Sequence, residues 1–206
     1  DNAKNVAYLA RPCQYTSLSD PEKPCDSSLW LSGRYSEEVI KTMSAAIDEI
    51  KARYDINNIN LIGYAGGGAV AALLAAERND VVSLRTIAGN LDHVVFSEAH
   101  GVEPLSQSLN PVMIAGQIRT IPQRHFIGGQ DNIIPSSVLH SYLQAAGKGN
   151  CVHTTFIQEA EHEAGWVEKW PELLKEETDC SGPVVNYDLE PFEPIKFMER
   201  PMPEKP

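Results

Sequence analysis

Short apolar runs alternate with amphipathic stretches along the chain from residue 5 to residue 174. Five of the runs have the length and bounding residues of β-strands, and they lie at 5–10, 59–63, 82–88, 124–128 and 151–157. The stretches between them favour helices, because apolar residues recur there at intervals of three and four. This alternation predicts an α/β fold with a mostly parallel sheet and helices on both faces.

The expected helices lie between and after these strands. Ser36 is expected to cap a helix that starts at Glu37, and an alanine-rich helix is expected at 66–77. Further helices are predicted at 137–146 and 163–174, whereas 89–122 is expected to be irregular apart from a helix starting at Pro111. The proline-rich texture after Asp179 divides the chain into a core, residues 1–179, and a C-terminal tail, residues 180–206, with no core of its own.

The charge balance excludes some classes of partner. A formal net charge of −11 argues against nucleic acid and anionic membrane surfaces, which both favour clustered Lys and Arg. The apolar runs are far shorter than the roughly 20 residues that a membrane span needs. A small-molecule partner is therefore expected.

The four cysteines are informative about the compartment. Cys13 and Cys25 flank a stretch rich in Ser, Pro and Asp, which a disulfide would close into a loop. Zinc is the competing interpretation, but no cysteine pair or histidine has metal-ligand spacing, and we expect no metal site. A Cys13–Cys25 disulfide predicts a periplasmic or secreted, envelope-associated protein, whereas four free thiols would fit the cytosol. A Cys151–Cys180 bond would require the tail to fold back onto the last strand.

The sequence INLIGYAGGGAVAALLAAER, residues 59–78, carries the main chemical signal. A strand runs through Gly63-Tyr64-Ala65-Gly66-Gly67 directly into a helix, which is the form of a nucleophile elbow, G-x-S-x-G, with alanine at its centre. The amide of Gly66 would then donate to an oxyanion. The alternative is a phosphate-binding glycine turn, but G-x-G-x-x-G spacing, a Gly-Lys-Ser/Thr ending and a ribose-binding acid are all lacking.

The residues that would complete a catalytic triad follow in the expected order. Asp131 comes directly after the strand at 124–128, and His162 comes after the last strand. His162 would act as the base for a nucleophile at position 65, and Asp131 would orient its imidazole. His153 is the alternative base and Asp92 the alternative acid.

These features resemble the serine hydrolases of the α/β-hydrolase superfamily, in particular bacterial exported or envelope-associated hydrolases with a GYSGGG elbow. The matching stretches are ARPCQY (10–15), the loop at 30–36, GYAGGGA (63–69), AGNLDH (88–93), HGVEPLSQSLNP (100–111), GGQDNIIP (128–135) and HEAGWVEKWPELL (162–174). The resemblance implies Asp131 and His162 as triad members and places Ala65 where the family has serine. It also implies that the strand at 5–10 is separated from the strand at 59–63 by one that this chain lacks.

Two expectations follow from these departures. An intact acid, base and glycine framework around Ala65 favours an engineered Ser→Ala change over a natural pseudoenzyme. The absent strand, with the Gly-rich loop that supplies a second oxyanion donor, is expected from an N-terminal companion segment or chain; a strand at 184–189 is a weaker substitute.

The predicted function is ester hydrolysis through an acyl-enzyme, without a cofactor and abolished here by Ala65. The substrate is expected to be a small-molecule ester whose pocket is lined by Tyr64, Asn90, Asp92 and His93, with Phe96 and His100 nearby. The alternative is a non-catalytic binding or assembly protein that retains a hydrolase pocket.

Overall fold

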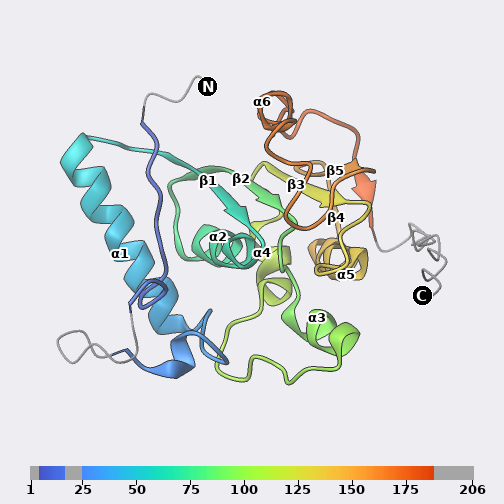
Figure 1. The fold of residues 1–206 in the computed structure, drawn as a ribbon. Helices are drawn as coiled ribbons and strands as arrows, with labels where there is room; N and C mark the ends of the chain where they lie inside the picture. Colours follow the sequence, from blue (N-terminus) through green and yellow to red (C-terminus); the bar gives the residue numbers. More distant parts are fainter. Residues whose placement is uncertain (1–4, 17–24, 188–206) are drawn as a thin grey trace.

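The computed structural model describes residues 5–16 and 25–187 (Figure 1). Its main sheet has four parallel strands, in the spatial order β1 (Ile59–Tyr64), β2 (Val81–Ile87), β3 (Gln123–Gly128) and β5 (Val152–Ile157). These are four of the five predicted strands, with ends that differ by one residue at most. The predicted α/β fold with a parallel sheet is confirmed.

Helices cover the two faces of the sheet unequally (Figure 1). One face carries the long helices α1 (Glu37–Tyr54), α2 (Gly66–Glu77) and α5 (Ser136–Ala146), and the other carries only the short α6 (Trp170–Leu173). Ser36 caps α1 as predicted, because its hydroxyl accepts a hydrogen bond from the amide of Val39 at 3.3 Å. The remaining elements are η1 (Ser27–Leu29), α3 (His93–His100), η2 (Pro111–Ile114), α4 (Ala115–Ile118), β4 (Lys148–Gly149) and β6 (Val185–Asn186).

The apolar core is largest on the face that carries the long helices. α2 is apolar on all sides and lies between α1, the sheet and η2, which explains why its alanines are buried. The opposite face has a smaller core, in which Trp166 and Leu173 pack with Ile87 and Phe126. The carboxyl ends of the strands, where the predicted site residues follow, are therefore supported from both faces.

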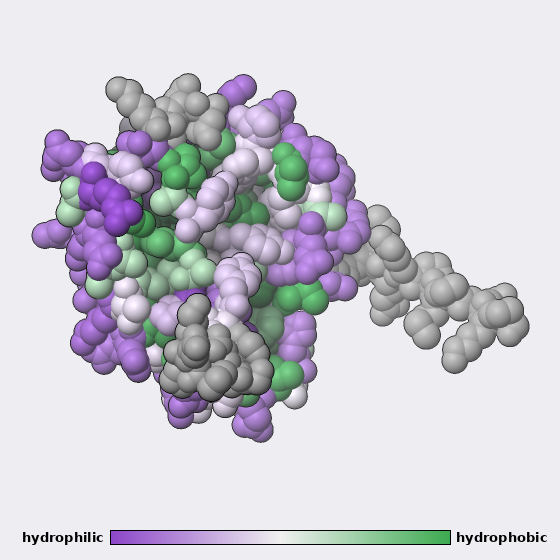
Figure 2. Space-filling model, turned by 60° about the vertical axis from the view of Figure 1, so that its left-hand side comes forward, coloured by the Kyte–Doolittle hydropathy of each residue, from purple (hydrophilic) through white to green (hydrophobic). Residues whose placement is uncertain are grey.

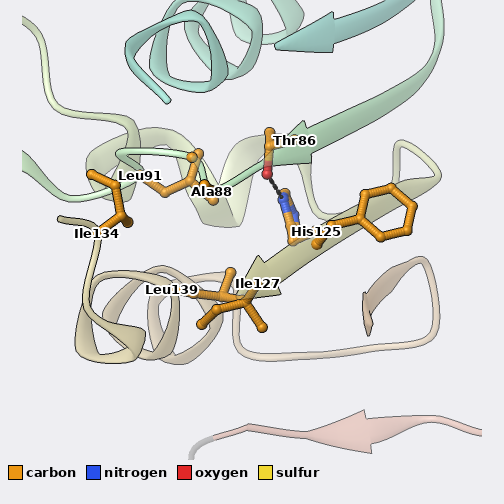
Figure 3. Close-up of a pocket in the computed structure, with 9 residues that line it drawn as sticks. Thr86, Ala88, Leu91, His125, Ile127, Ile134 and Leu139 are labelled. Carbon is orange, nitrogen blue, oxygen red and sulfur yellow. Dashed lines mark hydrogen bonds between the residues drawn. The ribbon is translucent and has the colours of Figure 1, made fainter. Parts of the chain in front are cut away.

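A buried polar row crosses the middle of the sheet beneath a small internal pocket (Figure 3). His125 Nδ1 lies 2.8 Å from the Thr86 hydroxyl, and His125 Nε2 lies 3.1 Å from Gln123 Oε1, which also accepts from Tyr142. Because Gln123 Oε1 can only accept, Nε2 carries the proton and Nδ1 accepts from Thr86. Burial lowers the pKa of His125 to about 3, so the ring is neutral in the folded protein.

The predicted strand at 5–10 is not present. Residues 5–10 have no regular structure, and their side chains are exposed, with Tyr8 96% exposed. β1 lies at one edge of the sheet, and within the described residues no strand pairs with its outer edge. A single extended segment has no ladder to stabilise it, which explains why the apolar pattern alone was insufficient.

Ile62 is 50% exposed, and Figure 2 shows apolar side chains among polar ones on the side where α1 comes forward.

Two helix predictions also need correction. The helix expected at 163–174 is limited to Trp170–Leu173, because Gly165 adopts a positive φ of 85° and the Trp166 indole donates to the carbonyls of Glu161 and His162. The segment expected to be irregular contains α3. The Asp92 carboxylate caps this helix by accepting hydrogen bonds from the amides of Val94 and Val95.

Both disulfides are formed, and the second explains the position of the tail. Cys13 pairs with Cys25, and Cys151 with Cys180. The Cys151–Cys180 bond folds residues 180–187 back onto the core, where β6 pairs antiparallel with β4. β6 thus belongs to a separate two-stranded sheet and does not substitute for a strand beside β1. The six prolines of the tail fall mostly at 191–206, outside the described residues.

The neutral buried His125 predicts a loss of stability in acid. The folded protein keeps the ring neutral down to a pH of about 3, whereas the unfolded chain takes up a proton below about pH 6.5. The free energy of unfolding should fall by about 1.4 kcal/mol per pH unit from this residue as pH drops from 6.5. Urea titrations at pH 7.0, 6.0 and 5.0 should give a shallower dependence for His125→Gln than for the parent; equal slopes would contradict the prediction. His93, whose pKa burial also lowers, contributes to both proteins alike.

Removing the Cys151–Cys180 bond should destabilise the domain. The bond closes a loop over a sequence separation of 29, for which the chain-entropy model gives about 3.6 kcal/mol. Urea denaturation of the Cys151→Ala/Cys180→Ala double variant measures this loss. Cys13→Ala/Cys25→Ala, with a separation of 12, is the matched control and should lose less. An unchanged midpoint in the first variant would show that residues 180–187 do not depend on the bond.

Candidate active site

The turn between β1 and α2 has the geometry of a strained elbow. Ala65 adopts φ 49° and ψ −118°, a conformation that L-residues rarely populate. A Cβ atom at Gly63 would lie 2.1 Å from the carbonyl oxygen of Gly67, so only glycine fits at that position. Gly68 similarly allows the helix to approach Gly89 after β2, because its Cβ would lie 2.9 Å from that backbone.

The elbow leaves a backbone donor free beside position 65. The amide of Ala65 donates to the carbonyl of Ile87, and the carbonyl of Ala65 accepts from the amides of Gly68 and Asn90. These bonds fix the turn to the neighbouring strand. Within the described part of the chain, the amide of Gly66 has no acceptor, as expected for the first residue of a helix. It can therefore donate to an anion that develops beside residue 65.

Asp131 and His162 are brought together at the carboxyl ends of β3 and β5. His162 Nδ1 lies 2.9 Å from Asp131 Oδ2, and the other carboxylate oxygen accepts from the amides of Ile133 and Ile134 at 2.9 and 2.8 Å. Asp131 is buried, so its position is set by these three bonds. With Nδ1 donating to the carboxylate, Nε2 is left as an acceptor for a proton.

Tyr64 connects the histidine loop to the elbow. Its hydroxyl donates to the carbonyl of His162 at 2.9 Å, and its ring centre lies 5.3 Å from that of the imidazole. The indole of Trp166 donates to the same carbonyl at 2.9 Å. Tyr64 and Trp166 thus both hold the backbone of His162, and Tyr64 is the residue directly before Ala65. Sequence reasoning missed Trp166, whose only signal was its position four residues after His162.

The two alternative residues are occupied elsewhere. Asp92 caps α3 and also accepts from Asn110 and Ser141, at 2.8 and 2.6 Å. His153 lies near the start of β5, where its Nε2 lies 2.9 Å from the carbonyl of Asp179 and 4.0 Å from the carboxylate of the same residue. Neither Asp92 nor His153 contacts the other members of the predicted triad, whereas Asp131 and His162 contact each other at 2.9 Å.

The remaining predicted pocket residues differ in their exposure. Tyr64 is 44% exposed, whereas Asn90 and His93 are buried. Among the residues that the structure describes, Asn90 Oδ1 and both ring nitrogens of His93 have no hydrogen-bond partner. His100 packs on Phe96 and contacts the carbonyl of Ile133, which ties α3 to the loop of Asp131.

Tyr35 is a further residue at the elbow that sequence reasoning missed. It is buried, and its hydroxyl would lie 2.7 Å from a Cβ atom at Gly66, so it lies beside the free amide. Its position just before the first turn of α1 gave no sign of this contact. In the described residues, no group of three His, Cys, Asp or Glu side chains is arranged to hold a metal ion.

No family model matches the chain, and no curated protein matches it. Solved structures do. An esterase from Pyrococcus furiosus is similar at 18% identity and a TM-score of 0.53, over 70% of this chain and 60% of that one. Puromycin hydrolase is similar at 15% identity and a TM-score of 0.53, over 64% of this chain and 23% of that one. A serine-to-alanine mutant of puromycin hydrolase in complex with PGG gives 16% identity and the same TM-score.

These similarities concern the fold. The chain spans about three-fifths of the esterase and under a quarter of puromycin hydrolase. The order of elements and the parallel sheet correspond over most of the described core. The chain therefore has the fold of the α/β-hydrolases, with a four-stranded part of the sheet.

Proposed function

We propose that this chain is an ester hydrolase of the serine type in which alanine occupies the nucleophile position. The observation that supports this most is the His162–Asp131 pair, fixed by Tyr64 beside an elbow that only glycine at position 63 permits. A surface histidine or a turn aspartate would not require this arrangement. The similar esterase and puromycin hydrolase structures add support for hydrolysis by this fold.

With serine at position 65, each residue has a defined role. His162 Nε2 takes the hydroxyl proton as the serine oxygen attacks the ester carbonyl, and the Gly66 amide donates to the oxyanion. His162 then returns the proton to the leaving alcohol, and water hydrolyses the acyl-enzyme by the same steps. Asp131 holds the imidazole and stabilises its charged form. Ala65 has no oxygen, so the present chain can bind an ester without forming this intermediate.

We infer that Ala65 is an engineered replacement of serine. The backbone strain at Ala65 supports this, because such strain costs about 1–3 kcal/mol and is concentrated at active sites and other functional positions. The second candidate function is a natural pseudoenzyme that binds a ligand or assembles with a partner, and Ala65 itself is the observation that favours it. Restoring the serine separates the two.

We further propose that an N-terminal companion segment or chain pairs with β1. The unpaired outer edge of β1 and the exposed apolar side chains of Ile62, Tyr64 and Val82 support this. On the face of the sheet opposite α2, no helix of the described residues covers β1 (Figure 1). A companion strand would satisfy this edge and could supply a second oxyanion donor.

A periplasmic or secreted location is proposed from the two disulfides, which are typical of oxidising compartments. Among residues 5–16 and 25–187, no helix has both the length and the apolar character to cross a bilayer.

Ala65→Ser should give a chain that hydrolyses p-nitrophenyl esters. The triad acts as a unit, so adding His162→Ala or Asp131→Ala should remove most of the gain, on the order of 10⁴-fold in kcat. Release of p-nitrophenolate from a chain-length panel measures both steps. His153→Ala is the matched control and should leave the restored activity intact, because His153 contacts Asp179 and not the triad residues.

Two results would contradict the proposal. A restored activity that does not depend on His162 would exclude the triad assignment. A folded Ala65→Ser chain without activity on esters or amides would favour the pseudoenzyme.

The companion proposal predicts slow hydrogen exchange at the outer edge of β1 in the complete biological protein. In the 206-residue chain by itself, the outward-facing amides of β1 should exchange fast, whereas those of β2 and β3 are protected by ladders on both sides. Exchange measured by mass spectrometry on the protein isolated from its source provides the comparison. Equally fast exchange of β1 in both samples would argue against a companion strand.

A further inference from the structure

Two arginines lie together on the Tyr35 side of the elbow. The guanidinium carbon of Arg11 lies 5.8 Å from the centre of the Tyr35 ring, and Arg11 Nη1 donates to the carbonyls of Leu29 and Arg34, at 3.3 and 3.0 Å. Arg34 Nε donates to the carbonyl of Leu31 at 2.9 Å. Backbone carbonyls therefore fix both side chains, and the Arg34 side chain also hydrogen-bonds to Tyr35.

Among the described residues, neither arginine has an acidic partner. The chain has 28 Asp and Glu residues and a net charge of −11, yet within the described residues no carboxylate lies within 4.0 Å of Arg11 or Arg34. Burial lowers the pKa of Arg11, and the nearby charge of Arg34 lowers it further. Two cations held side by side without a counter-charge repel each other, and a bound anion would relieve this repulsion.

The pair borders the predicted oxyanion donor. The Tyr35 hydroxyl lies beside Gly66, and burial raises its pKa while the charges of Arg34 and Arg11 oppose the rise. The positive charges therefore act at the end of the ring that faces the elbow. His162 contacts the elbow through Tyr64, by the hydrogen bond from the Tyr64 hydroxyl and by the packing of the two rings. One side of the site thus carries the base, whereas Arg11 and Arg34, from other segments of the chain, bring the cations.

This arrangement has more positive charge than a neutral ester requires. The Gly66 amide already serves the oxyanion, and a purely structural arginine in an acidic protein is ordinarily paired with a carboxylate. The guanidinium of Arg34 has five N–H donors, and a group of this shape matches a carboxylate or phosphate, which it binds through two parallel hydrogen bonds.

We propose that Arg34, positioned by Arg11 and Tyr35, binds an anionic group, a carboxylate or phosphate, on the substrate of this site. The proposal rests on the hydrolase function proposed above and specifies its substrate class. The negative charge would lie on the part of the ester that extends toward Arg34.

The first test compares a charged ester with its neutral counterpart in the Ala65→Ser chain. The anionic substrates are the p-nitrophenyl half-esters of succinate, glutarate and adipate. Each is matched with its neutral mixed diester, in which the free carboxylate is methylated and the p-nitrophenyl group is retained. For at least one chain length, kcat/KM should be about tenfold or more higher for the anion, and the preference should decrease with added salt.

Matched variants assign the preference to Arg34. Arg34→Gln should reduce kcat/KM for the anionic ester about tenfold while leaving the neutral ester unchanged, and Arg34→Lys should retain part of the preference. Arg119→Gln is the control, because Arg119 is exposed at the end of α4, just before the start of β3. Thermal unfolding checks that the variants fold. Equal rates on both esters at every chain length, or a preference that persists in Arg34→Gln, would overturn the proposal.

A second measurement needs no restored activity. Isothermal titration of the Ala65 chain with monomethyl glutarate should give saturable binding that Arg34→Gln weakens about tenfold, whereas dimethyl glutarate should bind weakly to both. If the Ala65→Ser chain hydrolyses no ester, the proposed function fails, and saturable, Arg34-dependent binding of the half-ester still supports the anion site. Absence of saturable binding overturns the anion site whatever the activity.

Discussion

The close approach of two backbones at the elbow is the constraint on which the rest of the site depends. The carbonyl of Gly67 occupies the space that a side chain at Gly63 would need, and this forces Ala65 into a strained conformation. The strain turns residue 65 outward at the carboxyl edge of the sheet and leaves the Gly66 amide free. Backbone hydrogen bonds that join Ala65 to Ile87 at the end of β2, and to Asn90 just after it, prevent the turn from relaxing.

The charge-bearing residues around the elbow are fixed by hydrogen bonds from neighbouring loops. Asp131 accepts from two amides and from His162, so its carboxylate is oriented before any ligand arrives. Tyr64 and Trp166 hold the His162 carbonyl, and Asp92 fixes the start of α3. The site is therefore preorganised, which is the property that makes fixed dipoles and bases effective in catalysis.

The two sides of the elbow differ in chemistry because they come from distant parts of the chain. His162 arrives from the loop after β5, whereas Tyr35 and the two arginines belong to the described segments 11–16 and 25–35, which the Cys13–Cys25 bond and the arginine hydrogen bonds to backbone carbonyls connect. The base and the cations can thus be varied independently on one scaffold. In an acidic protein, two cations at this edge without a carboxylate partner among the described residues are consistent with an anionic ligand.

The sequence alone determined the parallel α/β fold, the elbow at 63–67 and the pair Asp131 and His162, because periodicity, glycine spacing and chain order are local or sequential signals. It failed for the strand at 5–10, because a strand needs a neighbouring strand to pair with. It also failed for the helix at 163–174, because the Trp166 indole donates to the carbonyl of Glu161 in the preceding loop. It left Asp92 as the alternative acid, and it did not find Tyr35, Arg11 and Arg34. These roles depend on which carbonyls, amides and rings meet in space, and only the tertiary structure decides that.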